Sequence, residues 1–94
     1  MLEKNLQQKI VQICKRHNIL AVKVDSTSTR GWPDLTLLLP CGTVLFIELK
    51  TERGRLSELQ KHTIGKIEQN KGKVHVIRSL DAFRQLVRAF DVNA

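Results

Sequence analysis

Aromatic side chains are scarce in this 94-residue sequence, which contains three Phe, one Trp and no Tyr. Proteins that bind single-stranded nucleic acid or RNA by base stacking present several aromatic side chains on one surface. Because the three Phe fall at positions expected in the core, Trp32 is the only aromatic residue left for such a contact. The composition argues against a base-stacking surface. We expect Trp32 to pack on the fold, and contact with a ligand is the alternative.

Long apolar runs and paired cysteine motifs are also missing. The longest uncharged run, from Leu35 to Ile47, contains a Pro and a Gly and is shorter than the ~20 residues of a membrane-spanning helix. No apolar segment of a secretory signal follows the N-terminus. Cys14 and Cys41 form no CxxC pair and have no His cluster beside them. We therefore expect no membrane span, a cytoplasmic location, and two free thiols that act as buried or half-buried apolar residues.

Acidic residues are the minority of the charged side chains. Nine Asp and Glu stand against sixteen Lys and Arg, which gives a formal charge of +7. Such an excess is typical of proteins that meet phosphate or an anionic membrane. With 41% hydrophobic residues the chain can form one core, so residues 1–94 are expected to be a single domain. A core this small hides only about two thirds of the unfolded surface, which makes a stabilising partner subunit plausible.

Hydrophobic periodicity and turn signals predict an α/β fold in the order α-β-β-β-α-β-α. Apolar stripes predict helices over Leu2–His17, Ser57–Lys71 and Leu80–Phe90, and Leu59 belongs to the stripe of the second helix. The strands are expected over Leu20–Val24, Asp34–Leu39, Thr43–Lys50 and Lys73–Ile77, with a turn-rich stretch at 25–29. These elements predict a mixed central sheet flanked by helices.

Two acidic residues are expected to face each other on neighbouring strands. If residues 40–42 form a three-residue hairpin loop, the register places Asp34 opposite Glu48. Like charges at such positions destabilise a sheet, so a positive group should lie between them. Lys50 projects to the same face as Glu48, because side chains alternate with period two along a strand. The alternative is a simple Glu48–Lys50 ion pair at the end of a strand.

Two further polar residues fall close to the apolar stripes of the predicted helices. Glu3 lies on the stripe of the first helix, where it either stabilises the first turn as an acid or points toward a cation bound by Asp34 and Glu48. Gln60 fits a capping box with Ser57 and equally fits a site residue. Carboxylate oxygens of this kind suit Mg²⁺ or Mn²⁺.

Together these residues resemble the VRR-NUC family of nucleases, within the wider PD-(D/E)XK superfamily. The resemblance rests on the segments Gly31–Asp34, Phe46–Thr51, Gly54–Ser57 with Gln60, Gly72–Val74 and Arg78–Ser79. It implies a restriction-endonuclease-like αβββαβ core, here followed by an extra C-terminal helix. It also implies a metal-dependent DNA endonuclease.

The resemblance assigns roles to single residues. The catalytic residues that it implies are Asp34, Glu48, Lys50 and Gln60. The implied ligands of Mg²⁺ or Mn²⁺ are Glu3, Asp34, Glu48 and the Leu49 carbonyl. The small size resembles stand-alone viral members, which are similar to Holliday-junction resolvases and act as homodimers. Branched DNA is therefore the expected substrate and, if the protein is viral, the host cytoplasm is the expected location.

Basic residues near these motifs are expected to contact phosphates. They are Arg30, Arg53, Arg55, Lys61 and Lys66. With so few aromatic residues, readout of backbone and shape in duplex or branched DNA is expected rather than base reading. A non-catalytic basic nucleic-acid-binding module is the alternative, in which the acids form structural pairs. A sequence-specific restriction-like nuclease is less favoured, because no extra recognition element is visible.

Overall fold

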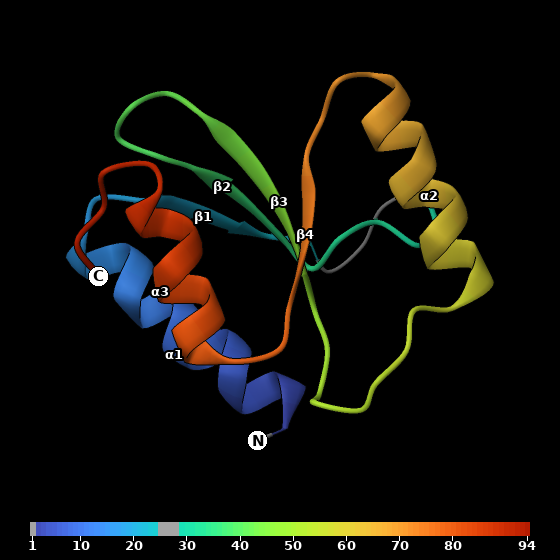
Figure 1. The fold of residues 1–94 in the computed structure, drawn as a ribbon, viewed down its shortest axis with the longest axis horizontal. Helices are drawn as coiled ribbons and strands as arrows, with labels where there is room; N and C mark the ends of the chain where they lie inside the picture. The colour runs from blue at the N-terminus through green and yellow to red at the C-terminus, as the bar shows by residue number, and fades with distance from the viewer. Residues whose placement is uncertain (1, 25–28) are drawn as a thin grey trace.

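A four-stranded mixed sheet organises the chain in the computed structural model, which describes residues 2–24 and 29–94 (Figure 1). The strands lie in the order β1 (Leu20–Lys23), β2 (Leu35–Leu38), β3 (Val44–Leu49) and β4 (Val74–Ile77). The β1–β2 and β2–β3 pairs are antiparallel, whereas β3 and β4 are parallel. The helices are α1 (Glu3–Arg16), α2 (Glu58–Gln69) and α3 (Leu80–Arg88). The predicted α/β class and element order are confirmed.

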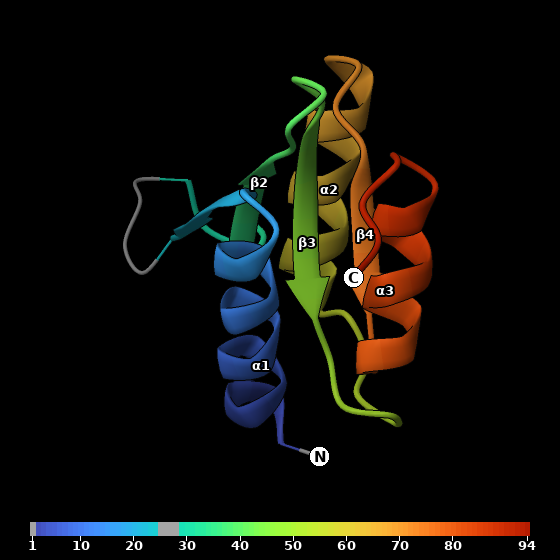
Figure 2. The same cartoon turned by 90° about the vertical axis from the view of Figure 1, so that its left-hand side faces the viewer.

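One face of the sheet carries the main hydrophobic core. Helices α1 and α3 lie together on this face, and α2 lies on the other side of the sheet (Figures 1 and 2). Along β2 and β3, every second side chain is a buried Leu or Ile that faces α1 and α3. The buried strand residues of this core are Leu35, Leu37, Leu39, Leu45, Ile47 and Leu49.

The opposite face is only partly covered, because α2 packs over β4. Four large apolar side chains of β1, β2 and β3 remain exposed by 42 to 60%: Leu20, Val22, Leu38 and Val44. The strand register places Leu20 beside Leu38 and Leu38 beside Val44, and Val22 follows on the same face by alternation. We call these four residues the open apolar face.

The β2–β3 hairpin has the predicted register. The backbone N–H of Leu39 donates to the carbonyl of Thr43 at 2.9 Å, and Leu35 pairs with Ile47. Gly42, with φ +90°, turns the chain between the two strands. Extended by one residue, this register sets Asp34 opposite Glu48.

Most element ends lie one or two residues inside the predicted ones, because the terminal residues act as caps or leave regular geometry. Ser57 is the N-cap of α2 rather than its first residue, and the predicted capping box with Gln60 is present. Lys71 and Asp91 have φ values of +71° and +65°, which take the chain out of the helical conformation after α2 and α3. The predicted turn at 25–29 lies outside the described residues except for Thr29.

Three predicted burials are wrong. Glu3 is exposed rather than inward, because the first turn of α1 extends beyond the ends of the strands (Figure 2). Cys41 is exposed at the hairpin tip, while Cys14 is buried as expected; both are free thiols. Leu59 is exposed because Thr63 and Ile67 form the buried side of α2. Among the described residues, no helix is long and apolar enough to cross a membrane.

Gly31 lets the segment before β2 approach α2 closely. It has φ +78°, and a Cβ there would lie 2.8 Å from the Leu59 carbonyl oxygen and 2.9 Å from the Thr63 hydroxyl. The Thr63 hydroxyl donates to the Arg30 carbonyl at 2.6 Å. This contact joins α2 to the turn that leads to Asp34.

Replacement of Gly31 by Ala is expected to lower the free energy of unfolding by at least about 2 kcal/mol, because strain at positive φ adds to the clash. Gly42→Ala is the matched control, since Gly42 also has positive φ but a Cβ added there would meet no atom within 4 Å. It should lose only about 1 kcal/mol. Urea denaturation measures both, and equal losses would show that close approach to α2 contributes nothing.

Candidate active site

Asp34 and Glu48 come together at one end of the β2–β3 pair. Asp34 directly precedes β2, and its Oδ2 accepts the backbone N–H of Leu49 at 2.8 Å. This bond fixes the Asp34 carboxylate across the two strands. Glu48, near the end of β3, is only 2% exposed. The hairpin thus holds one carboxylate beside a second one that is shielded from water.

Two further side chains contact the Glu48 carboxylate. The Gln60 side-chain amide donates to Glu48 Oε2 at 3.0 Å, and the Lys50 ammonium lies 3.8 Å from the same oxygen. At its other end, the Gln60 amide oxygen accepts the Ser57 backbone N–H at 2.9 Å. The two roles left open for Gln60 are therefore compatible, because its amide group caps α2 through oxygen and reaches Glu48 through nitrogen.

Burial is the main cause of a raised pKa at Glu48, and the neighbouring charges modify the shift. Burial raises the pKa of Glu48 from the ordinary 4.5 to about 7, and the neighbouring Asp34 carboxylate contributes to this rise, while Lys50 acts in the opposite direction. The charge of Glu3 makes a smaller contribution that also raises the Glu48 pKa. A cation between Asp34 and Glu48 would remove this repulsion.

The donor set fits a hard divalent cation. Within residues 2–24 and 29–94, no three Asp, Glu, His or Cys side chains form a ready-made metal cage. Mg²⁺ does not require one, because it commonly binds through one or two carboxylates and takes its other ligands from water and substrate phosphate. The opposed Asp34 and Glu48 supply that pair. Roles for Glu3 and the Leu49 carbonyl as additional ligands stay predictions.

Arg78 is a residue whose position the sequence did not explain. Its Nη1 donates to the carbonyl oxygens of Gly54 at 2.6 Å, Thr51 at 2.9 Å and Glu52 at 3.4 Å. These bonds hold the loop that leaves β3 directly after Lys50. No local pattern could reveal them, because they join residues 24 to 27 positions apart.

Four of the five predicted phosphate contacts lie on segments next to the acid pair, and the fifth, Lys66, lies further along α2. Arg30 precedes the turn that leads to Asp34, and Arg53 and Arg55 belong to the loop that Arg78 holds. Lys61 follows Gln60 on α2 and pairs with Glu58 at 3.2 Å. All four basic side chains are exposed and can meet an approaching polyanion.

The mixed sheet, with paired acids and a lysine at one strand end, defines a nuclease-type α/β domain. The model of the VRR-NUC domain family matches residues 1–81, and the chain belongs to this family. A solved structure described as a VRR_NUC domain has a TM-score of 0.81 to this chain at 23% identity, covering 92% of this chain and 94% of the other. That likeness establishes the shared fold. Comparison with curated proteins gives no match.

Without metal, the protein is expected to lose stability as the pH rises from about 4.5 to about 7. In this window native Glu48 retains a proton that the unfolded chain releases, so the slope of stability against pH is negative. Glu48→Gln removes the titration but keeps an oxygen for Gln60. Above pH 7 it should be more stable than the wild type by roughly 1 to 3 kcal/mol, whereas near pH 4 the two should be similar.

Urea denaturation in EDTA at several pH values measures this effect. Glu52→Gln, at an exposed position, is the control for loss of one negative charge. A Glu48→Gln difference that stays constant across the pH range would contradict the assignment of the titrating group.

Proposed function

We propose that this chain is a metal-dependent, structure-specific DNA endonuclease that hydrolyses phosphodiester bonds. The observation that carries the proposal is the buried Glu48 carboxylate opposite Asp34, with Lys50 and Gln60 at the same oxygen. Burying one acid beside another opposes folding unless a cation is bound there. A non-catalytic basic module would gain nothing from such an arrangement, so it is the less favoured function.

Each residue of the candidate active site has a separate role in the proposed hydrolysis. Asp34 and Glu48 would hold Mg²⁺ or Mn²⁺, with Glu3 and the Leu49 carbonyl as further ligands. When bound, such an ion neutralises phosphate charge and lowers the pKa of a coordinated water. Lys50 places its ammonium where negative charge develops on the phosphate and where it can orient the water. Gln60 keeps the Glu48 carboxylate in one orientation.

Branched DNA, including four-way junctions, is the proposed substrate class. The formal charge of +7 and the exposed Arg30, Arg53, Arg55 and Lys61 favour contacts with the phosphate backbone. A panel of duplex, flap, splayed and four-way DNA, incubated with Mg²⁺, Mn²⁺ or EDTA, tests both the substrate and the metal requirement. Equal cleavage of all four DNAs would contradict the structure preference.

A homodimer is the proposed active species. The open apolar face lies partly on β1, an edge strand with no neighbour on its outer side among the described residues. Joining two such faces about a two-fold axis would bury exposed apolar surface of a 94-residue chain. A dyad-related pair of sites would also match the symmetry of a junction.

Replacement of Lys50 by Ala is expected to reduce cleavage at least about 100-fold, since its charge acts on the transition state. DNA affinity should stay within several-fold, because one lysine contributes little to binding summed over many phosphates. Gel cleavage assays and fluorescence anisotropy measure the two effects. Lys9→Ala, at an exposed position on α1, is the matched control. Turnover of Lys50→Ala comparable to wild type would remove Lys50 from the mechanism.

Sedimentation at micromolar concentration is expected to give twice the monomer mass. Val22→Lys should shift the protein toward monomer, because it places charge on the open apolar face. Mixing wild type with Lys50→Ala should give heterodimers that nick one strand of a junction. A DNA-bound monomer that still makes paired cuts would refute the dimer mechanism while leaving the nuclease assignment intact.

A further inference from the structure

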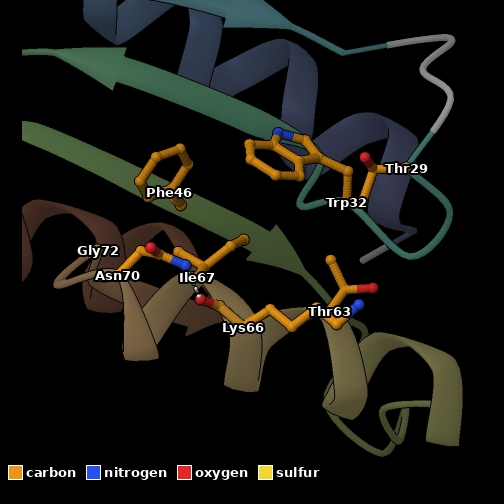
Figure 3. Close-up of a pocket in the computed structure, with 8 residues that line it drawn as sticks. All are labelled: Thr29, Trp32, Phe46, Thr63, Lys66, Ile67, Asn70 and Gly72. Atoms are coloured by element: carbon orange, nitrogen blue, oxygen red, sulfur yellow. Dashed lines mark hydrogen bonds between the residues drawn. The ribbon is translucent and has the colours of Figure 1, made fainter.

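A pocket of about 360 Å³ lies between α2 and the sheet, on the same side as the acid pair (Figure 3). Trp32 and Phe46 border it from the sheet side, while Ile67, Lys66 and Asn70 border it from α2. Trp32 packs edge to face on Phe46, with ring centroids 5.7 Å apart. The packing predicted for Trp32 is thus present, but the half-buried indole also forms a wall of this pocket.

The residues that line the pocket lie close in sequence to those of the candidate active site. Trp32 lies two residues before Asp34, and Phe46 lies two residues before Glu48 on the same face of β3. Two residues along a strand correspond to about 7 Å. A nucleotide whose phosphate meets the acid pair therefore has this pocket within reach of its base or of a neighbouring base.

The chemistry of the walls suits a flat aromatic ring that carries a negative charge nearby. Two aromatic side chains and Ile67 supply apolar surface, and the exposed Lys66 supplies a cation at the rim. The Asn70 side-chain nitrogen donates to the Lys66 carbonyl at 2.9 Å, so its amide oxygen can accept from a ring N–H or amino group. Unstacked nucleobases are recognised by this combination of stacking and edge hydrogen bonds.

We propose, building on the nuclease function proposed above, that this pocket binds one unpaired nucleobase of the DNA substrate beside the cleaved phosphate. A base in continuous duplex must first be unpaired and unstacked, which costs free energy and opposes its entry into the pocket. A base at a branch point or bulge is already unpaired, so its entry costs less. The pocket therefore favours branched DNA through one small aromatic-lined site, in a chain that has few aromatic residues.

Trp32 is the only Trp in a chain without Tyr, so its fluorescence reports on the pocket directly. In EDTA, the wild-type protein is titrated with three DNAs: a duplex with one unpaired thymine, the same DNA with an abasic site there, and the fully paired duplex. The thymine-containing DNA is expected to quench Trp32 emission at least about twice as strongly as the other two at saturation. Equal quenching by the thymine and abasic DNAs would overturn the proposal.

A second experiment fills the pocket with a larger side chain and measures DNA affinity. Asn70→Phe places a ring at the pocket, whereas Gln69→Phe adds the same ring at an exposed neighbouring position that does not line it. Asn70→Phe should lose about tenfold or more in affinity for thymine-bulged DNA and less than about twofold for paired duplex. The control should keep both affinities, and melting temperatures verify folding.

Failure of this proposal differs from failure of the nuclease assignment. Normal Mg²⁺-dependent cleavage with no base-dependent quenching overturns the pocket alone. Base-dependent quenching without cleavage of any DNA overturns the nuclease assignment and leaves the pocket as a binding site. If Asn70→Phe turns a dimer into a monomer without changing DNA preference, the pocket belongs to an interface between two copies and the proposal is wrong.

Discussion

The opposition of Asp34 and Glu48 is the constraint on which the rest of the site depends. Both acids are held by the β2–β3 register, and Glu48 is buried, so their mutual repulsion cannot be relieved by moving into water. Lys50 and the Gln60 amide contact one oxygen of Glu48 and offset part of this repulsion. The repulsion that remains supports the proposal that the site binds a metal ion and acts on phosphate.

The layering of the fold leaves part of the sheet face that carries this site uncovered by helices. Helices α1 and α3 cover the leucine-rich face of the sheet, whereas α2 covers only part of the other face (Figure 1). Its capping box positions Gln60, and the close approach at Gly31 ties the turn before Asp34 to α2. The same arrangement leaves the pocket beside Trp32 and the open apolar face. The proposed catalysis, base binding and self-association would thus use adjoining parts of one surface.

The basic side chains that are proposed to contact phosphates lie on segments next to the acid pair. Arg53 and Arg55 lie on a loop whose carbonyl groups are held by Arg78, and this anchoring limits how far the two exposed side chains can spread from Lys50. Contacts to phosphates supply affinity and position without reading bases. A single pocket for an unpaired base adds discrimination that a purely basic surface lacks.

The sequence by itself determined the helices and strands, the hairpin register and the pairing of Asp34 with Glu48. Periodicity, turn length and capping depend on interactions over only a few residues. Helical periodicity also placed Glu3 on the inward side of α1, and this prediction is wrong. Periodicity does not show that the first turn of α1 extends past the sheet. Only the tertiary structure decided the half-covered face, the pocket between α2 and the sheet, and the Arg78 bonds to the β3 loop. These features join segments distant in the chain, and packing between whole elements sets their geometry.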